Sequence, residues 1–318
     1  MEKEFKVFRF DYKFSKIPGL TYFRFFKCVW DLYHKVKKEN KKPDLIHSNT
    51  LEINILAILI GKFFKIPVVI SEHWSGILKK KLSLKLKMKI KFAFNNSLEV
   101  MPVSKTLANE ISKLKIRSKL SIVPNVIDNQ LFYPKKQKSK DSKKRILYVG
   151  SLISTKGLVF LLQAINSLSN KRHDFKLDVI GDDKEKGEYQ VFVQKNDLIN
   201  FVEFHGLKNK IEVAEYMRNC DFYVQPSLIE TFGITFYEAL ACGKPVVATD
   251  IPALKENIDE TKGILVPPED TRSLEAAIDY MLDNFQNYNP EHLSQYVTNN
   301  FSKEVIKQKL YNVYKKYI

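Results

Sequence analysis

The sequence has little of what marks secreted, membrane-spanning or metal-binding proteins. Its three cysteines, Cys28, Cys220 and Cys242, lack the spacing of a metal site, so we interpret them as reduced thiols of a cytosolic protein. No apolar run approaches the roughly 18 residues of a membrane span, and the longest, residues 53–64, is interrupted by polar residues and a glycine. The first twenty residues carry charges throughout and have no apolar signal-peptide core.

Acidic residues are scarce in the first part of the chain. Residues 1–134 hold 26 Lys and Arg against 11 Asp and Glu, and residues 135–145 hold 7 against 1. Residues 146–318 hold 19 against 24, so the first two segments account for the net charge of +16. A basic half of this kind favours an anionic partner. Because no recognised nucleic-acid motif accompanies the charge, we expect no nucleic acid.

Short β-favouring segments alternate with helical patterns along the chain. This alternation predicts an α/β fold with parallel sheets that helices cover on both faces. Strands are expected at residues 6–10, 44–47, 66–70, 98–103, 120–123, 145–149, 175–180, 202–207, 222–224, 246–248 and within 263–270. The lysine-rich segment 135–145 has no apolar residue, and we interpret it as a linker between two domains.

Residues 79–94 carry seven lysines interleaved with apolar residues. From Leu82 to Phe94 the alternation is typical of a strand with one lysine face. A crossover between the parallel strands at 66–70 and 98–103 favours a helix, and we therefore predict a helix here. Its lysines form either a solvated surface or a surface that lies on anionic lipid.

The most informative stretch is residues 226–250. β-favouring residues precede it, residues 236–242 predict a short helix, and residues 246–248 predict the next strand. A strand–loop–helix unit places its loop at the carboxyl edge of a parallel sheet, where open α/β sheets bind ligands. Glu230 and Glu238 bracket the start of the helix. The backbone N–H groups at that start suit a phosphate, and they belong to Phe232, Gly233 and Ile234.

A second loop, at residues 150–157, is also a candidate for binding phosphate. After the strand at 145–149 the chain leaves through Gly150 into a loop that carries Lys156 and opens a helix. This geometry also suits a phosphate, with Lys156 as a point charge near it, although a surface loop lysine is the plainer interpretation. The adjacent aspartates at 182–183 follow a strand, and we interpret them as loop residues rather than a metal site.

These motifs resemble one known family. Glu230 and Glu238 have seven residues between them, Phe232-Gly233 lies inside, and Cys242-Gly243 with Pro245-Val-Val follows. Together with the loop from Gly150 to Gly157, this string resembles the retaining glycosyltransferases of the GT-B fold, in their largest nucleotide-sugar-dependent family. The resemblance implies two Rossmann-like domains, a UDP- or GDP-sugar donor, no further cofactor and no metal ion.

The resemblance also implies roles for single residues near the donor sugar. Glu230 would lie by that sugar, and His73, which follows the strand at 66–70, would face it. From position alone, His73 is equally a hydrogen-bonded loop histidine. We interpret His47, within a strand, as structural. No general base is evident, which fits transfer on one face with the leaving diphosphate accepting the proton.

Other residues would bind the nucleotide. By the same resemblance, Glu238 would hold the ribose, Gly150 and Lys156 the diphosphate, and the loop at His205-Gly206 would lie near the base. Two positions depart from the family pattern. Ser151 stands where many members have arginine after the glycine, and Val126 replaces a glycine in the Pro-Asn-Gly-x-Asp signature, which this chain otherwise matches with Asn125 and Asp128.

The implied organisation has an incomplete first domain. We expect a truncated acceptor-side domain at 1–134, a linker at 135–145, a nucleotide-sugar-binding domain at 146–302 and a C-terminal helix at 303–318 that packs back on the first domain. Members of the family begin with a central strand and a glycine-rich acceptor loop before the segment that matches residues 6–10 here.

The sequence thus predicts sugar transfer to a glycan or lipid-linked acceptor in surface polysaccharide biosynthesis, such as lipopolysaccharide or capsule. We expect a cytoplasmic protein held peripherally on the anionic inner membrane surface. The alternative is a truncated, non-catalytic nucleotide-sugar-binding protein, or a subunit that needs a partner chain.

Overall fold

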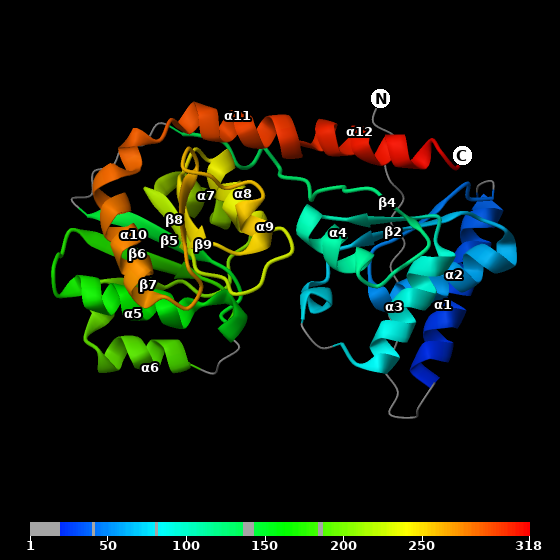
Figure 1. Cartoon of the computed structure of the whole chain (residues 1–318), viewed down its shortest axis with the longest axis horizontal. Coiled ribbons are helices and arrows are strands. Elements are labelled where there is room, and N and C mark those ends of the chain that lie inside the picture. The colour runs from blue at the N-terminus through cyan, green and yellow to red at the C-terminus, as the bar shows by residue number, and fades with distance from the viewer. Residues whose placement is uncertain (1–19, 40–41, 80–81, 136–142, 184–186) are drawn as a thin grey trace.

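The computed structural model describes residues 20–39, 42–79, 82–135, 143–183 and 187–318. The strand predicted at residues 6–10 lies outside these ranges. The described residues form two lobes along the long axis of the molecule, each built on a parallel sheet (Figure 1). This confirms the α/β class and the two parallel sheets.

The first sheet has the strand order β1-β2-β3-β4 and the second the order β10-β9-β8-β5-β6-β7. The strands of the first sheet are β1 (Ile46–Ser48), β2 (Val68–Glu72), β3 (Glu99–Pro102) and β4 (Lys119–Leu120). Those of the second are β5 (Lys144–Val149), β6 (Phe175–Ile180), β7 (Val202–Phe204), β8 (Phe222–Gln225), β9 (Val246–Thr249) and β10 (Gly263–Val266). In the second sheet the chain winds outward from β5 in both directions, so the strand order reverses between β5 and β8.

Helices connect the strands, as parallel pairing requires. The first lobe contains α1 (Leu20–Glu39), α2 (Leu51–Phe64), η1 (Ser75–Leu78), α3 (Leu84–Asn96) and α4 (Lys105–Ser112). The second contains η2 (Ser154–Lys156), α5 (Leu158–Ser169), α6 (Glu188–Lys195), η3 (Leu198–Asn200), α7 (Lys210–Asn219), α8 (Ile234–Ala241), α9 (Pro252–Lys255), α10 (Thr271–Asn284) and η4 (Phe285–Asn287). Two C-terminal helices follow, α11 (Pro290–Phe301) and α12 (Lys303–Tyr314).

Alternating side chains place the core on both faces of each sheet. In the first sheet Ile70 and Val100 face α3 and α4, while the neighbouring Val69 and Met101 face α12. In the second sheet the side chains of β5 alternate in the same way between α5 and α10 on one face and α7 and α8 on the other. Both sheets therefore present their strand ends, rather than their faces, to ligands.

The segment at 84–96 is a helix, as predicted, despite its strand-like alternation. Ser83 caps α3 by accepting a hydrogen bond from the backbone N–H of Leu86. Ile90 and Phe94, four residues apart, are fully buried, so one helical stripe enters the core. No helix in the described ranges is both long and apolar enough to cross a bilayer.

The chain enters the second lobe earlier than the predicted linker suggests. Lys144 and Arg145 belong to β5, because they pair with Phe175 and Lys176 of β6. Before the linker, the carbonyl of Leu131 accepts a hydrogen bond from Arg218 of α7 at 2.6 Å. The boundaries of the two domains stay a prediction.

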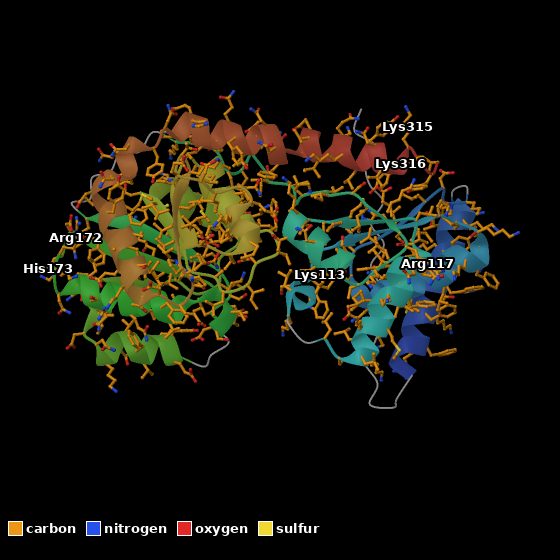
Figure 2. All side chains as sticks on the ribbon, viewed as in Figure 1. Lys113, Arg117, Arg172, His173, Lys315 and Lys316 are labelled. Carbon is orange, nitrogen blue, oxygen red and sulfur yellow. The ribbon has the colours of Figure 1, made fainter. Side chains whose placement is uncertain are left out.

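The C-terminal helices connect the two lobes. α11 packs on α8 in the second lobe, and α12 continues along the same side of the molecule over the first sheet (Figure 1). Lys316, just after α12, lies over the first lobe (Figure 2) and donates to both carboxylate oxygens of the buried Glu99, at 2.9 and 3.1 Å. The end of the chain is therefore fixed to the lobe where the described chain begins.

Candidate functional site

The loop between β8 and α8 lies at the carboxyl edge of the second sheet. Glu230 in this loop is 9% exposed, and its Oε1 lies 2.5 Å from Nζ of Lys156. The hydroxyl of Ser227 donates to the same oxygen at 3.1 Å. Gly233 then turns the chain into α8 with φ of +83°, in the left-handed region that glycine adopts most easily. Two residues that are 74 apart in sequence thus form one ion pair beside a helix start.

Phe232 and Glu238, the other side chains of this motif, are buried. Phe232 is 2% exposed and stacks on Tyr237 with ring centroids 4.5 Å apart, so only its backbone faces the helix start. Glu238 lies within α8, and burial raises the pKa of its carboxyl to about 7, although Lys210 opposes the shift. Burial therefore favours the neutral form of this carboxyl relative to a carboxyl in water.

The loops after β5 and β8 are joined through their backbones. The N–H of Leu228 donates to the carbonyl of Thr155 at 2.9 Å. At Gly157, φ is +71° and a Cβ atom would lie 1.9 Å from the carbonyl oxygen of Pro226, so no other residue fits without a shift of the backbone. This close approach fixes the distance between the Lys156 loop and the Glu230 loop.

The first lobe reaches this site through the turn after β2. The hydroxyl of Thr231 donates to the carbonyl oxygen of His73 at 3.1 Å, which connects residues 158 apart. The imidazole of His73 is exposed; partial desolvation lowers its pKa, and a hydrogen bond with Asn125 opposes the shift. His73 and Glu230, predicted separately from distant parts of the sequence, therefore both lie beside this contact between the two lobes. A cleft between the lobes is lined by Lys105 and Thr106 on one side and by Asp250 and Glu256 on the other.

His47 has a different position. Its Nε2 lies 2.8 Å from the hydroxyl of Ser71, and its Nδ1 lies 2.6 Å from the hydroxyl of Tyr314 on α12. The ring is therefore held between β2 and the C-terminal helix, which agrees with the structural interpretation. Asp128 of the signature segment is likewise engaged, because its carboxylate accepts from the backbone N–H groups of Gln130 and Leu131.

Comparison with known proteins identifies the family. Residues 129–300 match the model described as "Glycosyl transferases group 1", and residues 4–131 match that described as "Glycosyltransferase Family 4". An uncharacterized glycosyltransferase of Methanocaldococcus jannaschii is 30% identical over 84% of this chain and 74% of its own length. The chain belongs to the group 1 glycosyltransferases. This family transfers sugars from nucleotide sugars with retention.

Other similar proteins have lower sequence identity to this chain. Alpha-monoglucosyldiacylglycerol synthase of Streptococcus pneumoniae is 25% identical over 79% of this chain and 62% of its own length. Sucrose-phosphate synthase from Thermosynechococcus elongatus has the same fold, with a TM-score of 0.81 at 22% identity over 95% of this chain and 80% of that one. HepE of Anabaena, solved with UDP-glucose, has a TM-score of 0.75 at 20% identity over 90% and 82% of the two chains. The GT-B architecture is thereby established. This chain spans 62 to 74% of the two curated relatives named here.

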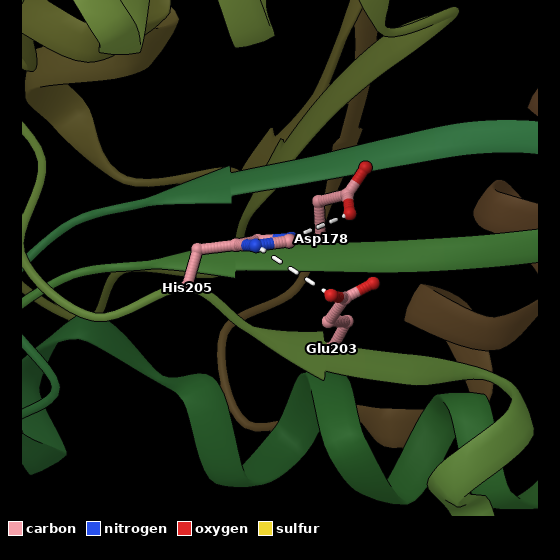
Figure 3. Close-up of side chains that lie close together, drawn as sticks. All are labelled: Asp178, Glu203 and His205. Atoms are coloured by element: carbon pink, nitrogen blue, oxygen red, sulfur yellow. Dashed lines mark hydrogen bonds and ion pairs between the residues drawn. The ribbon is translucent and has the colours of Figure 1, made fainter.

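In the loop predicted to lie near the base, the side chain of His205 contacts Asp178 of strand β6. Nε2 of His205 lies 2.7 Å from Oδ1 of the buried Asp178 (Figure 3). The centre of its ring lies 4.8 Å from that of the Tyr216 ring. The side chain therefore packs between Asp178 of β6 and Tyr216 of α7. What faces the carboxyl edge is the turn at Gly206, where φ is +66° and a Cβ would meet no atom within 4 Å.

The same histidine belongs to a grouping that sequence spacing did not reveal. Asp178, Glu203 and His205 offer ligand atoms within 4.8 Å of one another, because β6 and β7 pair Asp178 with Glu203 (Figure 3). Arg145 lies 3.6 Å from the Asp178 carboxylate, and Lys176 lies 2.5 Å from that of Glu203. Arg145 and Lys176 thus place positive charge beside the two carboxylates.

Glu72, next to His73, is a residue that sequence reasoning missed. It ends β2, is 3% exposed, and its Oε1 accepts from the backbone N–H groups of His73 and Trp74 at 3.0 and 2.8 Å. Burial raises the pKa of this carboxyl to about 7. Its only sequence signal is an acidic residue at the end of an otherwise apolar strand. Glu72 fixes the turn that carries His73 toward the second lobe.

Proposed function

We propose that this protein transfers a sugar from a nucleoside diphosphate sugar, UDP-linked or GDP-linked, to a lipid-linked or glycan acceptor, with retention of configuration. The observation that carries the proposal is the ion pair of Lys156 with Glu230 at the start of α8, opposite His73. Glu230 holds the Lys156 ammonium at this helix start, where a diphosphate would bind.

The proposed catalysis depends on stabilising the negative charge that develops on the leaving diphosphate. As the glycosidic bond to the diphosphate breaks, negative charge grows on the phosphate oxygens, and fixed cations and N–H groups aimed there lower the barrier. Lys156 and the backbone at Gly233 would supply them. Glu238 would accept hydrogen bonds from the ribose hydroxyls, and the His73 turn with Glu230 would hold the sugar for attack from the side of the leaving group.

The acceptor side is proposed to lie at a membrane. The exposed apolar residues of α3 repeat every four positions, so Leu84, Met88 and Phe92, which are 73%, 57% and 41% exposed, form one stripe. Phe63 of α2 is 69% exposed, and Nζ of Lys62 lies 5.9 Å from the centre of the Phe92 ring. We call this surface the α2–α3 face, with the members Leu59, Lys62, Phe63, Leu84, Lys85, Lys87, Met88, Lys89, Lys91 and Phe92.

The α2–α3 face combines apolar side chains with lysines, the combination that suits an anionic bilayer surface. We place this attachment on the cytoplasmic leaflet, because that leaflet is anionic and the three cysteines are free thiols. An acceptor with a lipid anchor would then reach the cleft from the membrane, in a pathway such as surface polysaccharide biosynthesis.

The test is transfer by the purified chain. We expect turnover of UDP- or GDP-sugars with membrane extracts or synthetic polyprenyl-linked sugars, and NMR of the product should show the anomeric configuration of the donor. Inversion of configuration would contradict the mechanism. Absence of transfer together with absence of nucleotide binding would contradict the donor site itself.

A further inference from the structure

A glutamine occupies the place in the second sheet where an apolar residue is expected. Gln225 is the last residue of β8, between buried valines and tyrosines, and is 1% exposed. A buried amide is costly unless it is hydrogen-bonded. Its Oε1 lies 2.9 Å from the hydroxyl of Tyr223 and 3.1 Å from that of Thr235. The position therefore calls for an explanation beyond core packing.

The location of Gln225 provides one. The strand order reverses between β5 and β8, and open parallel sheets bind ligands in the crevice beyond the strand ends at such a point. Gly150 leaves β5 on one side of this crevice, and Gln225 ends β8 on the other. A Cβ atom on residue 150 would lie 2.4 Å from Nε2 of Gln225, so the amide fills the space that the glycine leaves open.

The amide also reaches the helix start. Thr235, its second hydroxyl partner, lies in the first turn of α8, directly after Gly233 and Ile234. The hydroxyl of Tyr223, its other partner, also lies 3.0 Å from the carbonyl oxygen of Val149, the residue before Gly150, so its single proton is shared between the two acceptors. One side chain is thus connected to the end of β5 and to the beginning of α8, the two backbone segments that flank the proposed diphosphate.

We propose that Gln225 is a positioning residue for the donor diphosphate. It holds the Gly150 turn and the first turn of α8 at a fixed separation, so that their N–H groups meet the phosphates without rearrangement. This inference rests on the proposed donor site. It does not require Gln225 to touch the ligand.

The test compares a nucleoside diphosphate with its nucleoside in calorimetry on the full chain, using UDP and uridine. Gln225→Met keeps the length of the side chain and removes both polar atoms. We expect it to weaken UDP about tenfold, the loss of one to two hydrogen bonds, and to change uridine by less than about twofold. Thr235→Val, a half-buried swap of equal shape, should lower UDP affinity in the same sense even if Gln225→Met does not fold.

A matched control separates positioning from stability. Met281→Ala creates a cavity in the core beneath the same sheet, away from the crevice, and should lower the melting temperature without changing the ratio of UDP to uridine affinity. An unchanged ratio in both Gln225→Met and Thr235→Val would overturn the inference. Wild-type protein that binds neither UDP nor GDP would instead contradict the proposed function.

Discussion

At the scale of single residues, the site contains two carboxyl groups, Glu72 and Glu238, whose pKa values burial raises to about 7. Between the ordinary carboxyl pKa and 7 the folded protein binds protons that the unfolded chain releases, so stability falls as pH rises through this window and is flat above it. Glu238→Gln should remove the part of this fall in unfolding free energy that Glu238 causes, on the order of 3 kcal/mol. Urea unfolding of wild type and variant at pH 5, 6, 7 and 8 measures the difference. Parallel pH profiles would mean that Glu238 titrates normally.

Ligand affinity should follow pH in the opposite direction. If the Glu238 carboxylate accepts hydrogen bonds from the donor ribose, nucleoside diphosphate binding should strengthen as pH rises through 7, because the charged form is the better acceptor. Glu238→Gln provides the matched control, since it experiences the same titration of the ligand phosphates. Calorimetry from pH 6 to 8 should give a steeper rise for wild type than for the variant. Equal slopes would exclude the ribose role.

Lys156 should contribute to the binding of a nucleoside diphosphate but not to the binding of the nucleoside alone. Lys156→Ala removes the cation beside Glu230 and should cost about 1.5–3 kcal/mol in diphosphate binding, the range for a hydrogen bond to a charged group, with little change for the nucleoside. Lys171→Ala is the control, because Lys171 pairs with Glu275 at 2.5 Å just after α5 ends, whereas Lys156 lies just before α5 begins. Similar losses for diphosphate and nucleoside would place Lys156 elsewhere in the mechanism.

The residues that sequence reasoning found differ in kind from those it missed. Glu230, Gly233 and Glu238 lie in one short segment with a recognisable spacing, so their proximity is built into the chain. The missed role of Glu72 depends on its burial at a strand end. His205 was predicted from the sequence, but its contact with Asp178 depends on the pairing of β6 with β7. Strand register and burial are tertiary properties, and no local pattern encodes them.

At the scale of elements, α3 shows how topology overrides local periodicity. Its alternation of lysine and apolar residues fits a strand, yet the parallel strands β2 and β3 must be joined by a crossover. Because the helix has apolar residues on every side, some of them are left exposed after Ile90 and Phe94 enter the core. The helix was predictable from the order of elements, whereas the exposed stripe required the packed structure.

That stripe leads to a prediction about membranes. Each lysine near an anionic surface contributes about 1 kcal/mol to the binding free energy. The protein should therefore bind vesicles rich in anionic lipid and should not bind neutral vesicles. At 1 M salt, where the Debye length is about 3 Å, it should be released. Changing Lys85, Lys87, Lys89 and Lys91 to Gln should weaken sedimentation with anionic vesicles.

The control removes the same charge from another part of the first lobe. Lys113, Lys115, Arg117 and Lys119 are all exposed, and changing them to Gln lowers the net charge equally. We expect this variant to retain most of the binding. If both quadruple variants bind alike, net charge rather than the α2–α3 face determines attachment. If wild type ignores anionic vesicles at low salt, the lysines of α3 form a solvated surface.

At the scale of the whole molecule, the two lobes are connected at the cleft and by the C-terminal helices. Across the cleft, the carboxylate of Glu256 in the second lobe accepts from the backbone N–H groups of Lys105 and Thr106 at the start of α4. On the other side, α12 places Lys316 and Tyr317 on the fully buried Glu99. Desolvation raises the pKa of Glu99, but hydrogen bonds from Ser121, Lys316 and Tyr317 outweigh it and lower the pKa below its usual value. The stability they provide is therefore present above the ordinary carboxyl pKa and is lost as pH falls below it.

The attachment of α12 should be measurable as a coupling between Glu99 and Lys316. Lys316→Met leaves a buried carboxylate with fewer partners and should destabilise the protein by roughly 2–3 kcal/mol, the cost of a lost hydrogen bond to a charged group. Glu99→Gln combined with Lys316→Met should recover part of that loss, because the uncompensated charge is gone. Hydrogen exchange should show the change in β1, β2 and β3 before the second sheet, since α11 still holds the helix pair to α8. If the double variant is no more stable than Lys316→Met alone, packing of Ile306 and Val313 rather than the ion pair attaches the helix to the first lobe.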